Sequence, residues 1–456
     1  MRTYCSISEL RAAFKGQVIA PGDAAYDEAR TVFYGGIDQH PAVIIRVVDA
    51  DEVARVISLA RESGLELAIR NGGHSTAGYS VSEGGIVLDL SNMRDLQIDV
   101  EGRTAWAETG LTAGEFTSAV GAHGLAVGFG DTGSVGIGGI TLGGGVGYLV
   151  RKYGLTIDSL LAAEVVTADG QLLYVDADNH PDLFWAIRGG GGDFGVATRF
   201  QFQLHEVGFV VGGMLILPAT ADVIAGFIAA AEAAPHELST IANVMTAPPM
   251  PMLPEEYHGK PVVMSMLAYA GEAAQAERVI APFRALAKPL ADMVKPMTYP
   301  EIYPPEEGGY HPVAVGRTMF VDGIDSSVAE TILSYLRSST GSMAVAQLRV
   351  LGGAMARVPA DATAFAHRAS KIMVNVAALY ENPDENPTHE AWVTEFADAL
   401  YQTDAGAYVN FLGVESEATI RSAYPGGTWD RLAELKSRYD PDNLFRLNYN
   451  IPPVKV

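Results

Sequence analysis

The chain has 456 residues, of which 48% are hydrophobic and 19% charged. This composition supplies enough apolar material for a sizeable core and excludes a wholly disordered protein. Asp and Glu outnumber Lys and Arg by 54 to 31, for a net charge of -23, so the surface repels phosphate backbones and anionic lipid, and neither nucleic acid nor a membrane is an expected partner.

The single cysteine and the N-terminal residues exclude further classes of protein. Cys5 is the single cysteine, which excludes an intrachain disulfide and a cysteine-based zinc or iron–sulfur centre, and we expect no metal. The N-terminal residues lack the continuous apolar core of a secretory signal. The sequence contains no run of about 18 uncharged apolar residues, so we expect no membrane-spanning helix. We therefore expect a cytoplasmic protein.

The N-terminal part consists of short predicted elements joined by glycine-rich turns. Residues 40–47 predict a strand, and residues 49–64 predict a helix with acidic residues in its first turn and Gly64 as its C-cap. Residues 65–70 predict a second strand, which runs directly into the sequence N-G-G-H. The alternation in residues 160–175 predicts a hairpin with Asp169 and Gly170 at its turn.

The character of the sequence changes at about residue 207. Ala-rich stretches at residues 221–235 and 271–289 predict helices, and residues 261–270 and 342–353 predict strands. Pro-rich loops punctuate this region. Strands and helices in this order indicate a second domain of the α+β class.

Glycine is concentrated in two short segments, residues 128–147 and residues 189–195. Because glycine has no Cβ, backbone N–H groups in such segments can approach an anionic ligand closely, and a phosphate or pyrophosphate is the expected ligand. Tight turns in a β-rich domain are the alternative. The G-x-G-x-x-G that ends at Gly195 lacks the acidic residue about 20 positions on that a nicotinamide site requires. Motifs of P-loop, serine-hydrolase and zinc-protease sites are also absent.

His74 follows two glycines on a loop directly after a predicted strand. A histidine in this position can point its ring at a ligand that the same backbone contacts. A structural histidine is the alternative.

Four separated motifs carry a resemblance to a known family. They are R-N-G-G-H-S at residues 70–75, G-x-x-x-S-V-G-I-G-G-x-T-L-G-G-G-x-G at residues 130–147 with R-K-Y-G-L-T after it, D-L-F-W-A-I-R-G-G-G-G-D-F-G-V-A-T at residues 182–198, and Y-D-P-x-N-x-F-R-x-N-x-N-I-x-P at residues 439–453. With these motifs the chain resembles the FAD-linked oxidases of the vanillyl-alcohol-oxidase superfamily, and in particular their berberine-bridge-enzyme-like branch.

The resemblance implies an α+β fold of two domains. An FAD-binding domain of two small α/β subdomains would comprise residues 1–205 and 413–456. A substrate-binding domain, residues 206–412, would cover the isoalloxazine ring with an antiparallel sheet backed by helices. The expected partners are a small-molecule substrate and O₂, and the protein would be a monomer or a homodimer.

The resemblance also implies how FAD is held. In the family the first motif wraps the pyrophosphate, and its histidine, here His74, is bonded to the 8α carbon of the flavin. Many relatives add a second bond from a cysteine, but that position is Thr132 here. We therefore expect attachment through His74 alone. Because double attachment in the family goes with open sites for bulky substrates, a large carbohydrate is a less favoured substrate. The residues expected at the cofactor are Arg70, Asn71, Gly72, Gly73, His74, Ser75, Tyr79, Thr132, Gly133, Ser134, Val135, Gly136, Gly139, Gly143, Tyr148, Val196, Asn448 and Asn450.

Val135 takes the position that, in relatives, faces the oxygen-reactive carbon of the flavin. A small valine there goes with an oxidase, because it leaves room for O₂, and a bulkier residue goes with a dehydrogenase. The resemblance therefore implies O₂ as acceptor and hydrogen peroxide as product. An ordinary core valine is the alternative.

The family's usual base positions hold Ala362, Phe411 and Val146 here. Tyr408 and, less directly, three other tyrosines remain as hydroxyls near the expected flavin site. A phenol with a pKa near 10 needs a cationic neighbour to act as a base at neutral pH. We take Tyr408 as the candidate catalytic base, with these alternatives: Tyr148, Tyr79 and Tyr449.

Together these features imply an FAD-dependent oxidase. Its substrate would be a small, rather apolar alcohol or amine, or a secondary-metabolite intermediate, which passes a hydride to covalently bound flavin. The alternatives are a flavin dehydrogenase with another electron acceptor, a non-catalytic flavin-binding protein, and a sugar-binding protein without flavin.

Overall fold

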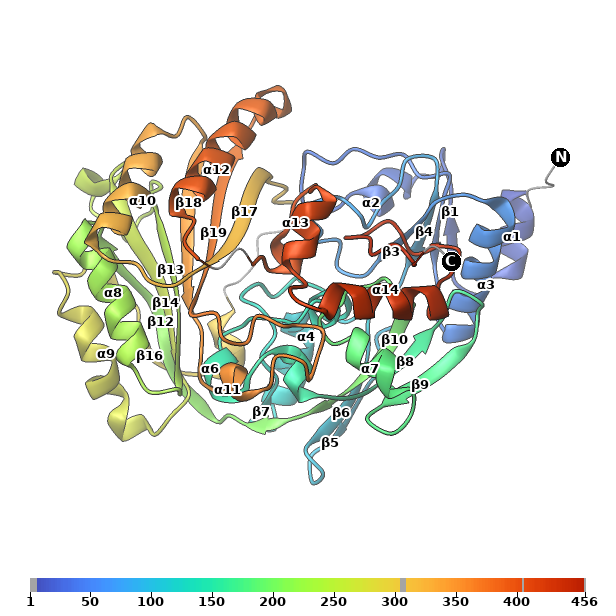
Figure 1. Ribbon diagram of the computed structural model, residues 1–456, viewed down its shortest axis with the longest axis horizontal. Helices are drawn as coiled ribbons and strands as arrows, with labels where there is room; N and C mark the ends of the chain where they lie inside the picture. The colour runs from blue at the N-terminus through green and yellow to red at the C-terminus, as the bar shows by residue number, and fades with distance from the viewer. Residues whose placement is uncertain (1–5, 304–308, 404–405, 455–456) are drawn as a thin grey trace.

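The computed structural model describes residues 6–303, 309–403 and 406–454. Three main sheets carry helices on their faces (Figure 1), which confirms the expected α+β class. In the described ranges no helix combines the length and the apolar character needed to cross a membrane.

The first sheet contains the predicted strands around residues 43 and 67. Its strand order is β1-β2-β4-β3, with β2, β4 and β3 parallel and β1 antiparallel. The elements are β1 (Gln17–Ile19), β2 (Val43–Arg46), β3 (Leu67–Arg70), β4 (Ile86–Asp89), α1 (Ile7–Ala13), α2 (Tyr26–Arg30) and α3 (Ala50–Ser63). The predicted helix α3 is confirmed, with the Asp49 side chain accepting from the Glu52 N–H at its start and Gly64 (φ 69°) at its end.

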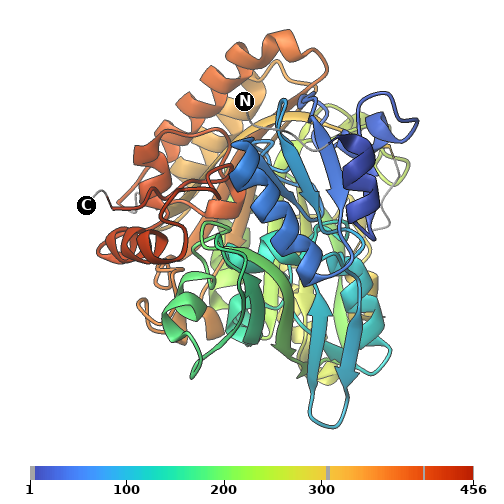
Figure 2. The same ribbon diagram turned by 90° about the vertical axis from the view of Figure 1, so that its right-hand side faces the viewer.

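The second sheet is antiparallel, with the order β5-β6-β10-β8-β9. The predicted hairpin is confirmed as β8 and β9, and Gly170 at its turn has a φ of 84°. Figure 2 shows this sheet beside the first one, with the β5–β6 hairpin extending from its end. The strands of this sheet are β5 (Leu96–Asp99), β6 (Thr104–Glu108), β8 (Leu160–Val166), β9 (Leu172–Asp176) and β10 (Val196–Gln203). This part of the chain also contains a separate two-stranded sheet of β7 (Leu125–Ala126) and β11 (His205–Glu206), and the helices α4 (Ala113–Gly121), α5 (Ile137–Leu142), α6 (Val150–Tyr153) and α7 (Pro181–Ala186).

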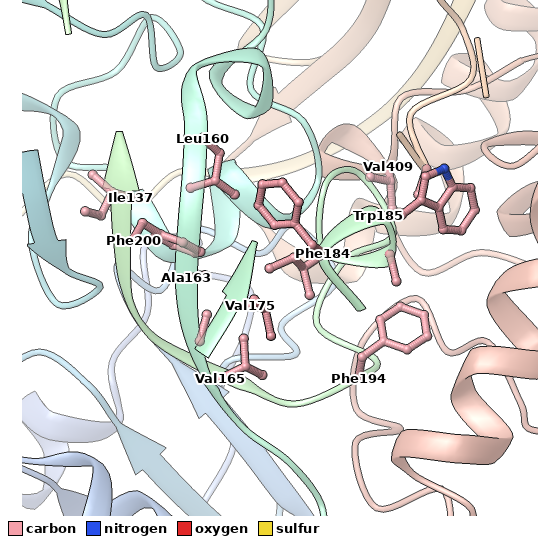
Figure 3. Packing of buried hydrophobic residues seen from close by; sticks show 14 of the residues in the cluster. Ile137, Leu160, Ala163, Val165, Val175, Phe184, Trp185, Phe194, Phe200 and Val409 are labelled. Atoms are coloured by element: carbon pink, nitrogen blue, oxygen red, sulfur yellow. The ribbon is translucent and has the colours of Figure 1, made fainter. Parts of the chain in front are cut away.

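The core beside the second sheet joins segments that are far apart in the sequence (Figure 3). Val165 and Phe200 from the strands pack in one buried cluster with Phe184 and Trp185 from α7. Val409, from near the C-terminal end of the chain, belongs to the same cluster. This shared burial fixes the C-terminal segments against the N-terminal part.

The third sheet has eight antiparallel strands and is covered on one face by helices (Figure 1). Its order is β15-β12-β14-β13-β18-β19-β17, and β16 also pairs with β12. The strands are β12 (Phe209–Pro218), β13 (Leu238–Thr246), β14 (Pro261–Tyr269), β15 (Ala291–Asp292), β16 (Lys295–Thr298), β17 (Val313–Val321), β18 (Met343–Val350) and β19 (Ile372–Tyr380). The covering helices are α8 (Ala221–Ala233), α9 (Ala276–Arg284), α10 (Ser326–Ser338) and α12 (Asn386–Leu400).

Short helices complete the chain. They are α11 (Ala354–Arg357), α13 (Glu417–Ser422), α14 (Thr428–Tyr439) and the 3₁₀ turns η1 (Thr156–Ser159), η2 (Glu255–Tyr257), η3 (Ala273–Gln275), η4 (Tyr299–Ile302), η5 (Pro383–Glu385) and η6 (Val409–Phe411). After the third sheet the chain returns to the first two sheets through α14. The domain boundaries at residues 205 and 413 remain a prediction.

A buried arginine connects α6 to the third sheet layer. The Arg151 guanidinium donates to the carbonyl oxygens of Ala231 (2.7 Å) and Ala234 (3.0 Å) at the end of α8, and to that of Leu238 (3.0 Å). The last carbonyls of a helix lack intrahelical partners and carry partial negative charge. Arg151 therefore satisfies them and holds the helix layer against the glycine-rich segment.

Candidate active site

A cavity of about 370 Å³ lies where the His74 loop, both glycine-rich segments and the C-terminal segments meet. Thirteen of the predicted site residues line it: Asn71, Gly72, Gly73, His74, Ser75, Tyr79, Thr132, Val135, Gly136, Gly139, Val196, Tyr408 and Asn448. Six predicted residues are not among its lining residues: Arg70, Gly133, Ser134, Gly143, Tyr148 and Asn450.

The His74 loop begins where β3 ends. Arg70, the last residue of β3, donates from its guanidinium to the carbonyl oxygens of Ala29 and Thr31, the latter at 2.7 Å. The Asn71 side-chain oxygen accepts from the Gly138 N–H at 3.0 Å. These bonds anchor the start of the loop to α2 on one side and to α5 on the other.

The imidazole of His74 is held on two sides at the cavity wall. Its Nε2 lies 2.9 Å from the Ser134 Oγ. Its ring stacks on Phe33, with centroids 4.1 Å apart and planes inclined by 20°. Ser134 therefore positions the histidine from behind the cavity wall, although it does not line the cavity itself.

Glycine is required where this loop meets the second motif. A Cβ on Gly72 would overlap the backbone nitrogen of Gly136 and lie 3.0 Å from its Cα, and a Cβ on Gly136 would overlap Asn71. Only two residues without side chains allow the backbones to pass this closely. The glycines thus place His74 beside Thr132 and Val135.

Thr132 and Val135 stand at the positions that the resemblance singles out, and both line the cavity. The Thr132 hydroxyl lies 3.5 Å from the carboxylate of Asp131, another lining residue. A threonine cannot form the thioether that a cysteine would form at this place. The small Val135 side chain leaves the wall less crowded than a long or aromatic one would.

The four candidate tyrosines differ in position, but burial raises the pKa of each. The Tyr408 hydroxyl is buried and accepts from the Gly145 N–H (2.9 Å) and the Asn410 side-chain amide (3.0 Å). Desolvation still raises the pKa of Tyr408, and it also raises the pKa values of the others: Tyr79, Tyr148 and Tyr449. At neutral pH all four are neutral phenols.

Tyr148 is also displaced from the cavity. Its ring packs against Tyr303, with centroids 6.0 Å apart, in a buried cluster that includes residues of β12 and η4. The cavity is lined instead by Tyr79 and Tyr449, whose rings meet edge to face at 5.4 Å.

A buried charge cluster, which sequence reasoning missed, fixes the C-terminal segment at the cavity. Lys436 contacts the carboxylate of Asp440 at 2.7 Å and that of Asp193 at 3.7 Å. Asp193 also accepts from the Ile451 N–H at 2.9 Å. Burial raises the pKa of Asp193 to about 7. Both carboxylates lie inside recognised motifs, and Lys436 is one helical turn before Asp440, but nothing local marks Asp193 as its second partner.

The residues at the cavity fit FAD. Among the buried side-chain atoms that have no hydrogen-bond partner in the part of the chain that the structure describes, three belong to cavity-lining residues: Asn71 Nδ2, Asn448 Oδ1 and Ser80 Oγ. Asn450, two residues beyond Asn448, has the same kind of unpartnered oxygen. Buried polar groups are normally paired. FAD offers phosphate and carbonyl acceptors as well as hydroxyl and imide donors, which suit these atoms.

Comparisons with known proteins agree with the motifs. A family model described as "FAD binding domain" matches residues 41–176, and one described as "Berberine and berberine like" matches residues 407–452. The (R)-6-hydroxynicotine oxidase of Paenarthrobacter nicotinovorans is 31% identical, over 97% of this chain and 97% of its own. Berberine bridge enzyme-like 6 of Arabidopsis thaliana is 27% identical, over 91% of this chain and 81% of its own.

A solved structure shares the whole architecture. The crystal structure of 6-hydroxy-D-nicotine oxidase from Arthrobacter nicotinovorans superimposes with a TM-score of 0.86 at 28% identity, and the match covers 97% of this chain and 98% of that chain. Motifs, cavity and comparisons therefore lead to one conclusion. The chain is an FAD-dependent oxidoreductase and belongs to the berberine-bridge-enzyme-like branch of the vanillyl-alcohol-oxidase superfamily.

Proposed function

We propose that the protein is an oxidase of a small, rather apolar amine, with FAD attached through His74 alone and reoxidised by O₂ to give hydrogen peroxide. The choice of an amine over an alcohol depends on one observation. Burial raises the pKa of Tyr408, the candidate base, and of the other tyrosines at the site.

An alcohol must lose its hydroxyl proton as the hydride leaves, so its oxidation needs a base within hydrogen-bond reach. A neutral amine has a free lone pair on nitrogen and can lose hydride from the adjacent carbon without a base. The neutral phenol of Tyr408, held by Gly145 and Asn410, then orients the substrate and keeps its proton. The similarity to (R)-6-hydroxynicotine oxidase supports the same choice.

The attachment is proposed from the position of His74 at the cavity wall. The stack on Phe33 and the contact with Ser134 hold its ring in one orientation, so little conformational entropy is lost when a bond to the cofactor forms. Thr132 excludes a second thioether at the neighbouring position. When bound, FAD supplies the hydride acceptor and the reaction with O₂, whereas the chain supplies position and environment.

The apolar part of the wall serves substrate binding. Ile140, Val146 and Phe411 line the cavity beside Tyr408, and they exclude water from the space where the amine would lie. Exclusion of water favours the neutral form of a bound amine, since a charged ammonium is costly to desolvate. Val135 at the same wall supports O₂ as the acceptor, and a dehydrogenase using another acceptor is the alternative.

The test is anaerobic reduction followed by exposure to air. The holoenzyme is mixed without oxygen with a panel of secondary and tertiary amines, including (R)-6-hydroxynicotine, and with the corresponding alcohols. We expect an amine to bleach the flavin absorbance, and air to restore it with release of hydrogen peroxide. The pH profile of kcat/KM should follow the pKa of the substrate amine. Bleaching by alcohols alone would overturn the choice of an amine, and failure of air to restore the absorbance would overturn the oxidase.

A further inference from the structure

One face of the third sheet carries a row of polar side chains across four adjacent strands. The strand register pairs Asn243 of β13 with Gln347 of β18, Gln347 with Asn375 of β19, and Asn375 with Thr318 of β17. Their neighbours along the strands belong to the core beneath the covering helices: Ala242, Val244, Ala346, Leu348, Val374 and Val376. Because side chains alternate along a strand, the polar row faces away from those helices.

The next row along the strands shows where this face lies relative to the cavity. Arg349, Met373 and Phe320 are paired across β18, β19 and β17. Met373 and Phe320 pack in one buried cluster with two cavity-lining residues, Val146 and Tyr408. Two residues along a strand span about 7 Å. The polar row therefore lies one such step beyond the wall that Tyr408 forms.

Arg349 connects the cavity wall to the polar row. Its guanidinium donates to the carbonyl oxygen of Val146 (2.9 Å) and to the carboxylate of Asp131 (2.6 Å), and both of these residues line the cavity. On its other side it donates twice to the Gln347 side-chain oxygen, at 2.9 and 2.7 Å. The ion pair with Asp131 neutralises the arginine, so the row next to it presents dipoles rather than a net charge.

The direction of the hydrogen bonds along the row follows from this arginine. A guanidinium has only donors, so the Gln347 oxygen must face it, and the Gln347 amide nitrogen faces Asn243. That nitrogen donates to the Asn243 side-chain oxygen at 3.0 Å. The amide nitrogen of Asn243 is thus turned away from Gln347, with two N–H donors to offer.

Several groups of the row lack a partner. Over the described ranges, neither the Asn243 amide nitrogen nor the Asn375 side chain has a hydrogen-bond partner. The Thr318 hydroxyl also has no partner, and only 8% of this residue is exposed. A buried hydroxyl without a partner is unfavourable unless a ligand or a water molecule forms the missing hydrogen bond with it. Gln347 lies between Asn243 and Asn375 in the row, and both asparagines are half-buried. Unpaired polar groups on one face of the sheet indicate a surface that can bind something polar.

We infer that the polar row is a substrate-recognition row, in which Asn243 binds a neutral carbonyl or hydroxyl oxygen of the substrate, one strand step beyond the wall that Tyr408 forms. The Asn243 N–H groups donate to that oxygen, and the absence of net charge in the row disfavours a carboxylate at the same place. This inference deepens the proposed amine oxidation and names a second feature that its substrate must have.

The test compares ligands that differ only at the distal position. N-Methylbenzylamine and its para-hydroxy and para-carboxy derivatives are assayed for flavin reduction. 4-Methylacetophenone and 4-ethyltoluene, which carry no amine, are titrated into the holoenzyme and followed by the perturbation of the flavin absorbance. We expect the hydroxy compound and the ketone to be favoured by about tenfold over the unsubstituted compound and the hydrocarbon, which is the effect of one good hydrogen bond.

Variants locate the preference in the row. Asn243→Leu removes the donors, and Asn243→Asp keeps the size of the side chain but replaces the donors with a charged acceptor. Both should abolish the preference for the hydroxy compound and for the ketone. Thr240→Val, on the same strand but on the helix-covered face, is the control and should keep the preference.

The outcomes separate the two proposals. Equal binding of ketone and hydrocarbon by the parent, or an unchanged preference in both Asn243 variants, would overturn the recognition row even if amines are oxidised. A tenfold preference that both Asn243 variants abolish would support the row even if no amine reduces the flavin, in which case only the proposed function fails.

Discussion

Replacing Gly72 with alanine tests the contact that places His74 at the cavity. The added Cβ would overlap the Gly136 nitrogen and lie 3.0 Å from the Gly136 Cα and 3.1 Å from the Ser134 carbonyl oxygen. These are backbone atoms, which cannot rotate out of the way as a flexible side chain can. The loop itself must therefore move.

The movement stretches two hydrogen bonds that cross the contact. One joins the Gly138 N–H to Asn71 at 3.0 Å, and the other joins Ser134 to His74 at 2.9 Å. Overpacking costs about 1–3 kcal/mol, and each lost hydrogen bond adds about 1 kcal/mol. We expect Gly72→Ala to lower the free energy of unfolding by about 3–5 kcal/mol.

Urea denaturation of the holoenzyme, followed by tryptophan fluorescence, measures this loss, and absorbance measures the flavin content. Gly73→Ala is the matched control, because Gly73 has a φ of 71° but no atom closer than 3.6 Å to an added Cβ. Its backbone strain should cost only about 1–2 kcal/mol. A Gly72→Ala protein that is as stable as the parent and carries a full complement of flavin would refute the reasoning.

Three further substitutions test an ion pair beside the site, a buried carboxylate and the cavity wall. Arg368→Met leaves the Asp158 carboxylate, whose side chain is only 9% exposed, without the guanidinium that contacts it at 2.8 and 2.9 Å. Urea denaturation should show a loss of about 3–5 kcal/mol. Adding Asp158→Asn should recover part of this loss, and an equal loss in the double variant would contradict the prediction. Burial raises the pKa of Asp193 to about 7, above its value of 3.8 in the unfolded chain, so its contribution to stability is full below that lower value and is lost as pH rises through about 7. In thermal melts the stability of Asp193→Asn, which is always neutral, should therefore rise relative to that of the parent from about pH 4 to about pH 7. A difference that does not depend on pH would count against the raised pKa. Val135→Phe should slow the reoxidation of reduced flavin by O₂ by at least about tenfold, which corresponds to a barrier increase of about 1.4 kcal/mol. The rate of anaerobic flavin reduction, measured by stopped flow, should stay unchanged. Equal reoxidation rates in the variant and the parent would show that Val135 does not lie on the path of O₂.

The elements and motifs with local signals were predictable from the sequence. Helix α3 has its capping residues at both ends, and the β8–β9 hairpin has Asp169 and Gly170 at its turn. The two glycine-rich segments, residues 128–147 and 189–195, indicated a ligand-binding backbone for a similar reason, since close backbone approach demands glycine. The role of His74 was implied by the family resemblance.

What depends on long-range pairing was not predictable in the same way. The residues of the recognition row come from four strands and meet only through the register of the third sheet. Lys436 lies one helical turn from Asp440, but its pairing with Asp193 has no local signal, because Asp193 lies far away in the sequence. Tyr148 stands inside a glycine-rich motif, but its ring packs against Tyr303 in a buried cluster whose other members come from distant segments.

The central claim is that His74 is the single covalent attachment for FAD. Intact-protein mass spectrometry under denaturing conditions tests it directly, since only a covalently bound cofactor remains on the unfolded chain. We expect the parent mass to exceed that of the polypeptide by one FAD, the flavin-bearing peptide to contain His74, and His74→Ala to have the mass of the polypeptide alone. A parent protein with the bare polypeptide mass, or a flavin that remains attached in His74→Ala, would contradict it.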